Sequence, residues 1–323
     1  MFMKKLFIKI ARYLGYELID QSNFSSPTLN KTLDQELSII NKKSIVLPLG
    51  EVKITRKVNS LFIVFRMNTD VEIWDQNKSR LFEKPKIEYS SRSLRSLIKS
   101  INSCKKKYPN ISINTVIVDD NSNEENIGLI KNIIKDQNIE IISLNYQKFK
   151  TVIKEQKTSQ TFANLASLLE SFKVAKERAE DLILFVEDDY LHFEEMIGEV
   201  VASYEKIASQ LNKDIFMCPA DYPYLYMEND PTNILIGNKR HWRTIDKTLC
   251  TFITSKELLN KYWDNFHKTC LDRHEPFEKY LNEIYKKEIC ISPIKSLSVH
   301  LTNINSSYGL SPFIDYKKLW DEN

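Results

Sequence analysis

One stretch of ten residues, 181–190, most constrains what this chain can fold into. Its apolar segment, residues 182–186, runs directly into three consecutive acids, Glu187, Asp188 and Asp189. A run this short and this apolar predicts a strand that is buried on both faces, the usual pattern in a parallel sheet. The acids then follow the carboxyl end of the strand, which is where open α/β sheets bind their ligands.

Three adjacent carboxylates repel one another unless a positive charge lies among them. A hard divalent cation with oxygen ligands, Mg²⁺ or Mn²⁺, would supply that charge, and such ions usually hold substrate phosphates at the same time. The alternative is a solvated acidic turn that caps the next helix. Perturbed carboxylates at a strand end indicate a functional site only with some probability, so both interpretations stay open at this point.

Composition excludes several other classes of protein. The chain has 323 residues and a net charge of +3, enough for one large domain or two small ones and too weakly basic to indicate nucleic-acid binding. The five cysteines are dispersed, which favours reduced, buried thiols in a cytoplasmic protein. Neither G-x-G-x-x-G nor G-x-x-x-x-G-K-[ST] occurs, which argues against a Rossmann dinucleotide site and a P-loop. No apolar run approaches the roughly 18 residues of a transmembrane helix.

Strand and helix patterns alternate through the middle of the chain. Buried-type strands are expected at 61–65, 113–118, 139–144 and 182–186, with amphipathic helices between them. Ser90 or Ser91 is expected to cap the first of these helices, and Ser122 and Glu125 have the spacing of a capping box. The alternation predicts an α/β fold, a Rossmann-like, mostly parallel sheet covered by helices. Right-handed crossovers would then gather the strand ends at one edge, together with Arg66, Asp119, Asp120, Asp188 and Asp189.

The ends of the chain differ from this central pattern. Residues 2–14 form an amphipathic pattern with Lys4, Lys5, Lys9 and Arg12 opposite an apolar stripe. This pattern fits either a helix lying in an anionic membrane interface or a helix packed on the body of the protein. We therefore divide the chain into an N-terminal helix (1–20), a linker or edge segment (21–58), a catalytic domain (59–302) and a tail packing on that domain (303–323).

Two motifs together resemble the signature of a known enzyme family. The first is the strand end V-I-V-D-D-N-S at 116–122, and the second is the strand end L-F-V-E-D-D at 184–189. Their order is similar to that in nucleotide-sugar-dependent glycosyltransferases of GT-A fold, family-2-like, which carry V-V-D-D-x-S followed by a D-x-D-type metal motif. The resemblance covers residues 60–300 in the order of its elements, and only the two motifs are specific.

The resemblance implies roles for particular residues. Asp119 and Asp120 would lie near the base and ribose of a nucleotide, and Asp189 would contact a Mn or Mg ion and the diphosphate. Asp188 would be its neighbour on the nucleotide side and Glu187 its neighbour on the metal side. Some members of this fold place a late histidine on the metal, which makes His300 a candidate ligand; a hydrogen-bonded histidine at a strand end is the alternative.

Further cations and acids complete the predicted site. Arg66, Arg243 and His241 are candidates for binding phosphate, although each is equally typical of an ordinary surface cation. For the catalytic base we rank Glu275 first, because Pro276 suits the first position of a helix and would place Glu275 at its start. Asp246 and Asp221 follow, the latter in a tyrosine-rich loop whose rings suit either a sugar or the filling of a cleft against the sheet.

The sequence therefore predicts a metal-dependent, inverting glycosyltransferase of the hexosyltransferase kind. It would act in polysaccharide biosynthesis, moving a sugar from a nucleotide diphosphate to a glycan or lipid-linked acceptor. It would be cytoplasmic, with peripheral contact to the inner face of the plasma membrane through residues 2–14. One alternative is another metal-dependent phosphate-ester enzyme, such as a nucleotidyltransferase, and the missing glycine-rich loop speaks against it. The other is a non-catalytic glycan-binding domain. Three adjacent acids argue against it, because they repel one another when no cation is bound.

Overall fold

The computed structural model describes residues 2–16, 18, 38–46, 50–70, 80–154, 159–227, 231–302 and 306–323. The α-helices in these ranges are α1 (Phe2–Tyr13), α2 (Lys86–Lys107), α3 (Glu124–Ile133), α4 (Ser159–Arg178), α5 (Met196–Leu211), α6 (Lys256–Lys261), α7 (Trp263–Thr269), α8 (Lys279–Tyr285) and α9 (Tyr316–Asp321). The strands are β1 (Lys43–Val46), β2 (Gly50–Lys53), β3 (Ser60–Met67), β4 (Ser112–Asp119), β5 (Ile139–Ser143), β6 (Leu182–Glu187), β7 (Tyr190–His192), β8 (Phe216–Met217), β9 (Ile234–Ile236), β10 (His241–Ile245), β11 (Phe252–Ser255), β12 (Cys290–Ile294) and β13 (Ser298–His300).

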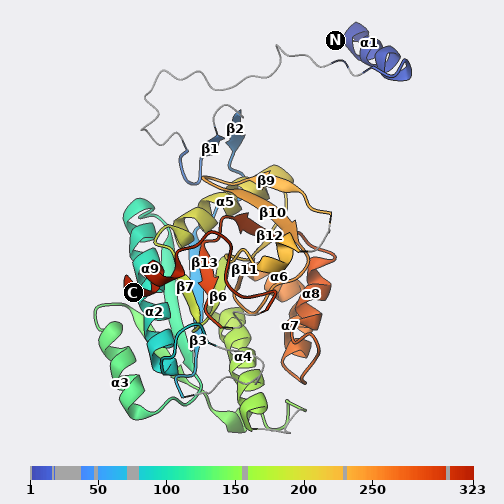
Figure 1. Cartoon of the computed structure of the whole chain (residues 1–323). Helices are drawn as coiled ribbons and strands as arrows, with labels where there is room; N and C mark the ends of the chain where they lie inside the picture. Colours follow the sequence, from blue (N-terminus) through green and yellow to red (C-terminus); the bar gives the residue numbers. More distant parts are fainter. Residues whose placement is uncertain are drawn as a thin grey trace.

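A central sheet of nine strands dominates the described part of the chain, in the order β5-β4-β3-β6-β11-β8-β12-β10-β9 (Figure 1). The first four strands are mutually parallel. Beyond β6, strands β11 and β10 run against the others, so the second half of the sheet is mixed. The predicted α/β class and mostly parallel sheet are confirmed, and the antiparallel direction of β10 and β11 was not predicted from the sequence.

The strand at 182–186 is buried on both faces, as its composition predicts. Ile183 and Phe185 point into a core formed with α4, α6 and α7. Leu182, Leu184 and Val186 point into a second core formed with α2, α3 and α5. Because neighbouring side chains alternate between the faces of a strand, a wholly apolar run is the sequence such a two-sided sheet requires.

Three predicted helix starts are wrong. Helix α2 begins at Lys86 with Pro85 at its N-cap, so Ser90 and Ser91 lie buried within the helix. In its first turn, Lys86 lines a cavity described below and Tyr89 is fully buried. Helix α3 is capped by Asn123, which accepts a hydrogen bond from the Asn126 amide, whereas Ser122 accepts one from the Thr69 amide.

The third misplaced start is that of α8, which begins at Lys279 and not at Pro276. Residues 275–278 form bends and a turn ahead of the helix. Proline's fixed φ suits turns as well as first helical positions, so the sequence alone did not separate the two. Helix α6 is capped by Ser255, whose Oγ accepts a hydrogen bond from the Leu258 amide at 3.1 Å.

The tail at 306–323 packs on the domain through α9, which lies against α2 (Figure 1). The Trp320 ring stacks on Phe82 with 4.2 Å between centroids, and the Arg92 guanidinium covers it at 4.5 Å. Arg92 also donates to the Trp320 carbonyl at 2.7 Å. The end of the described chain thus reinforces the helix that begins at Lys86.

The described N-terminal elements differ in their contacts. The β1–β2 hairpin lies near α5, where Glu205 accepts hydrogen bonds from the amides of Asn41 and Val58. Helix α1 is drawn apart from the sheet and its helices (Figure 1), and several of its apolar side chains are exposed. None of the described helices has the length and hydropathy to cross a membrane. All five cysteines are buried and free of disulfides, as their dispersal predicts.

Candidate active site

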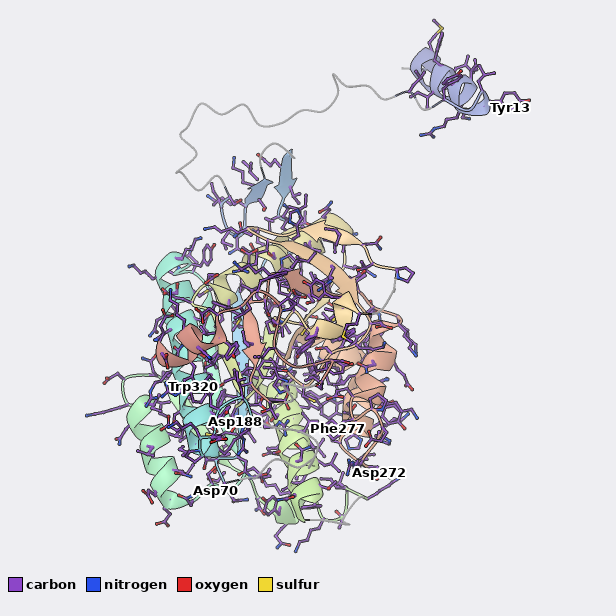
Figure 2. The ribbon with its side chains drawn as sticks, in the orientation of Figure 1. Tyr13, Asp70, Asp188, Asp272, Phe277 and Trp320 are labelled. Atoms are coloured by element: carbon purple, nitrogen blue, oxygen red, sulfur yellow. The ribbon has the colours of Figure 1, made fainter. Side chains whose placement is uncertain are left out.

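The carboxyl ends of β3, β4 and β6 meet at one edge of the sheet, as the crossover rule predicts. In the parallel register Arg66 lies opposite Glu187, and Met67 lies opposite Asp119. A cavity of about 160 Å³ opens at this edge. Its lining consists of Arg66, Met67, Asn68, Lys86, Asp120, Gln160, Asn164, Ser167, Glu187, Asp188 and Asp189. Figure 2 shows Asp188 near the lower end of α2 in this view.

Asp188 is held by three donors. Lys86 Nζ lies 2.6 Å from its Oδ1, and Ser90 Oγ donates to its Oδ2 at 2.5 Å. The Asn68 amide also donates to Oδ2, at 3.2 Å. Asp188 therefore ties the first turns of α2 to the end of β3, and its lone pairs are largely occupied.

Glu187 is engaged by Arg66 from the neighbouring strand. The Arg66 Nη2 to Glu187 Oε1 distance is 2.5 Å, and Asn164 and Ser167 of α4 accept from the other guanidinium nitrogen. Burial raises the pKa of the Glu187 carboxyl, against the lowering effect of Arg66. Arg66 and Glu187 thus neutralise each other within the cavity wall.

Asp189 faces His300, which β13 brings alongside β7. His300 Nε2 lies 3.3 Å from Asp189 Oδ2, and the His300 ring stacks on Tyr190 with 4.7 Å between centroids. Burial would raise the pKa of Asp189, but the charges of His300 and Lys86 outweigh it and hold that pKa well below its usual range. Burial lowers the pKa of His300 and Asp189 raises it, and the net result is a raised value.

The Asp189–His300 pair has the chemistry of a metal site. Asp189 Oδ1 is buried without a hydrogen-bond partner in the described part of the chain. His300 Nδ1 lies 2.9 Å from the Tyr308 carbonyl, which only accepts, so Nδ1 carries a proton. Nε2 faces the Asp189 carboxylate, and on losing its own proton to a metal it would offer the ion a lone pair. Two ligands of one Mg²⁺ ion are about 3 Å apart in octahedral geometry, close to the Nε2–Oδ2 distance.

The protein supplies only part of such a coordination sphere. Among the described residues, no group of three or more His, Cys, Asp and Glu side chains is arranged to hold a metal ion. A site with two protein ligands leaves positions for water and for the phosphate oxygens of a substrate, which is how Mg²⁺ is commonly bound. The residues present therefore fit a metal that is completed by its substrate.

The two acids after β4 play different structural parts. Asp119 is buried and accepts a hydrogen bond from the Ser122 amide at 3.2 Å, which fixes the turn; burial raises its pKa. Asp120 lines the cavity and accepts hydrogen bonds from Tyr146 OH at 2.5 Å and from Asn68 Nδ2 at 3.1 Å. Of the predicted pair, Asp120 is the one that borders the cavity.

Other predicted residues lie around a second cavity of about 310 Å³, lined in part by Tyr224, Arg243, Asp246 and Tyr285. Arg243 forms a buried ion pair with Asp221 and covers the Tyr226 ring at 4.2 Å. Burial raises the pKa of Asp221. The structure thus groups Asp221, Arg243 and Asp246 away from the residues that line the cavity at Asp189, and Arg243 is already occupied by a carboxylate.

The remaining two predicted residues are exposed. His241 begins β10, next to the edge strand β9, and its side chain faces solvent. The Glu275 side chain is 81% exposed and lies 3.2 Å from Arg273. Near its loop, the Leu271 carbonyl accepts a hydrogen bond from the amide of Lys154, which lies in the segment between β5 and α4. In Figure 2 the loop residues Asp272 and Phe277 lie on the other side of α4 from Asp188.

Sequence analysis did not identify Lys86 and Asn164, which line the cavity, or Tyr146, which donates a hydrogen bond to Asp120. For Lys86 a signal existed, because Pro85 directly before it is a common helix-start residue. Asn164 and Tyr146 carry no such signal. They lie on a helix and a loop whose approach to the strand ends depends on how α4 packs.

Comparisons with known proteins give a consistent set of distant similarities. No protein-family model matches the chain, and no curated protein matches it either. A crystal structure of S. aureus TarS 1–349 is similar, with 14% identity, a TM-score of 0.43, and coverage of 74% of this chain and 59% of that one. The galactosyltransferase LgtC with donor and acceptor sugar analogues has 13% identity and a TM-score of 0.34, covering 71% and 72%. GalNAc-T7 with UDP, GalNAc and Mn²⁺ has 11% identity and a TM-score of 0.42, covering 75% and 43%.

The chain thus spans less than two thirds of the TarS and GalNAc-T7 chains. Because every TM-score is below one half, we base the proposed function on the residues of this chain.

His192, on β7 just after the acidic motif, generates a prediction about pH. It is 2% exposed, its Nδ1 lies 2.7 Å from Ser298 Oγ, and burial lowers its pKa to about 3. Between that value and the 6.5 of an exposed histidine, only the unfolded chain binds the proton, so folding stability falls as the pH falls. Lowering the pH from 7.5 to 5 should cost about 2 kcal/mol through this residue.

Urea unfolding of the wild type and of His192→Asn at both pH values measures the effect. The variant should lose about 2 kcal/mol less on acidification. Parallel losses in the two proteins would show that the pKa of His192 is the same in the folded and the unfolded chain.

Proposed function

We propose that this protein is a metal-dependent glycosyltransferase that moves a sugar from a nucleotide diphosphate to a glycan or lipid-linked acceptor. The observation that carries the proposal is Asp189 at the end of buried β6, next to His300, with one carboxylate oxygen unpartnered among the described residues. It borders a cavity that also contains a cation, Lys86, and the acid Asp120. The two strand-end motifs that resemble family-2-like GT-A enzymes end at this cavity.

The residues that would hold the Mn²⁺ or Mg²⁺ ion are Asp189 and His300. When bound, the ion would neutralise the charge that grows on the departing diphosphate. Glu187 is a weaker candidate ligand because Arg66 already occupies its carboxylate. Asp188 would orient this part of the site by fixing Lys86 and Ser90 of α2.

The nucleoside would lie on the side of Asp120. Its carboxylate is fixed by Tyr146 and Asn68, so it presents a defined acceptor to a ribose hydroxyl or a base N–H. Asp119 would act indirectly by holding the turn at Ser122. Holding both substrates in a fixed geometry is the part of catalysis that such contacts provide.

Loss of the metal ligand tests the proposal. Asp189→Asn keeps the shape of the side chain and removes its charge, and the residue is at a strand end rather than in the core. We expect Mn²⁺-stimulated release of nucleoside diphosphate from a panel of nucleotide sugars to be abolished, with the fold retained by circular dichroism and the melting temperature lowered, because His300 loses its charged partner. Release of pyrophosphate from nucleoside triphosphates and sugar phosphates by the wild type would instead favour a nucleotidyltransferase. Turnover by Asp189→Asn near the wild-type rate would contradict the assignment.

For the catalytic base we keep Glu275 first, since its carboxylate is exposed, whereas Asp221 is held in a buried pair with Arg243. A side-chain base that assists in-line attack would invert the anomeric centre, and it must reach the acceptor hydroxyl directly or through one water. The exposed carboxylate of Glu275 is able to meet an incoming acceptor.

Glu275→Gln removes basicity and keeps the shape of the side chain. We expect a large loss of transfer rate with donor affinity unchanged, measured by product formation and calorimetry; Asp246→Asn is the matched control. Normal transfer by Glu275→Gln together with a large loss in Asp246→Asn would assign the role to Asp246.

Helix α1 would contact a membrane. Met3, Phe7, Ile10 and Leu14 recur at helical spacing and are between 49% and 74% exposed. Basic residues lie on the same helix and acidic residues are absent from its first turn. An exposed apolar stripe with a basic opposite face is the pattern of a helix that lies in an anionic interface. We place it at the inner face of the plasma membrane, where it would hold the enzyme near a lipid-linked acceptor.

Co-sedimentation with anionic vesicles at low salt tests this placement. The full chain should sediment, and a double variant, Phe7→Ser with Ile10→Ser, should lose most of the binding although its charge is unchanged. If both proteins bind equally, the attraction is purely electrostatic; if neither binds, α1 has another partner. High salt should weaken binding, since it screens the basic face.

A further inference from the structure

Lys86 is the cation that pairs with Asp188, the middle acid of the motif. Its ammonium lies 2.6 Å from Asp188 Oδ1, and both side chains are about nine-tenths buried, with 12% and 11% exposed. The neighbouring Asp189 also feels this charge, which contributes to the low pKa of its carboxyl. Lys86 therefore lies within the field of both acids and lines the same cavity.

Helix α2 carries Lys86, and the segment before it is hydrogen-bonded to the segment after β13, the strand that carries His300. The Leu81 amide donates to the Leu301 carbonyl at 3.1 Å, and Arg80 pairs with Thr302 in a short antiparallel bridge. Tyr89 OH lies 2.6 Å from both the amide and the carbonyl of Phe82, which fixes this segment on α2. The start of α2 is thus held in register with the Asp189–His300 pair.

A divalent ion at Asp189 would change the electrostatic environment of Lys86. The ion would repel the ammonium and take over the compensation of the acids, since like charges in a poorly hydrated cavity interact strongly. A bound diphosphate would at the same time offer the ammonium a new anionic partner. Lysine suits such an exchange, because its charge is a point on a flexible four-carbon stem and not a rigid fork.

We propose that Lys86 is an exchangeable counter-ion: it pairs with Asp188 in the free enzyme and turns to the diphosphate when metal and donor bind. This inference rests on the proposed function and adds a residue to it. The exchange predicts opposite effects on two affinities, that for the metal ion alone and that for a diphosphate. Removing the charge of Lys86 should strengthen the binding of metal alone, because a competing cation is lost, and should weaken the binding of a diphosphate.

Lys86→Gln tests the exchange, because glutamine retains a hydrogen-bond donor for Asp188 and removes the charge. The probes are Mn²⁺ alone, followed by electron paramagnetic resonance, and inorganic pyrophosphate in the presence of saturating Mn²⁺, followed by calorimetry. Pyrophosphate carries the diphosphate charge without requiring a particular base. We expect Mn²⁺ affinity to rise about threefold or more and pyrophosphate affinity to fall by a similar factor or more. Lys86→Arg, which keeps the charge, should restore most of the pyrophosphate binding.

Lys84→Gln is the matched control, since Lys84 lies two residues earlier, is exposed and does not line the cavity. It should leave both affinities unchanged. A purely structural role for Lys86 would lower both affinities and the melting temperature together, and that outcome, or no change in either affinity, would overturn the inference. If Lys86→Gln fails to fold, Lys86→Met provides a second variant that removes the same charge and leaves Asp188 its hydrogen bonds from Ser90 and the Asn68 amide. Failure of the wild type to bind Mn²⁺ or pyrophosphate would instead contradict the proposed function itself.

Discussion

Three consecutive carboxylates at the end of a buried strand are tolerated only when each has a different partner. Glu187 pairs with Arg66 from β3, Asp188 with Lys86 and Ser90 from α2, and Asp189 with His300 from β13. Buried charges without partners are costly, so these contacts constrain how β3, α2 and β13 are placed around β6. The cavity at the strand ends is the space that remains between the partners.

The three pairs differ in what they leave available. Arg66 is shared with Asn164 and Ser167 of α4, which makes that pair part of the wall. Asp188 is surrounded by donors on two elements. Of the three acids, only Asp189 has a buried oxygen without a partner in the described part of the chain, next to a histidine whose Nδ1 is fixed by the Tyr308 carbonyl. Within one short motif, Glu187 thus forms part of the cavity wall, Asp188 holds α2 in place, and Asp189 is the candidate metal ligand.

The C-terminal half of the chain contributes several contacts to this site, although it is far in sequence from the strands β3, β4 and β6. Strand β13 supplies His300, the turn at 306–308 orients it, and α9 supports the helix that carries Lys86. In the same half, Asp221 and Arg243 form a buried pair beside a separate, tyrosine-lined cavity. Acids that look equivalent in sequence therefore differ in function, because only some of them lie at the edge where the parallel strands end.

Much of this arrangement was determined by the sequence alone. The two-sided apolar run at 182–186, the alternation of helical and strand patterns, and the acids after two strands predicted an α/β sheet with Arg66, Asp120, Asp188 and Asp189 at one edge, and the structure confirms that grouping. These features are local: side-chain periodicity fixes strand and helix type, and the crossover rule fixes the edge.

The tertiary structure alone decided which acid pairs with which cation, that His300 faces Asp189, that Lys86 enters the cavity, and that Arg243 is occupied by Asp221. Those partners are separated by between 22 and 121 residues in the chain, so no local pattern records them. They form only when packed elements exclude water and each remaining charge must find its nearest opposite.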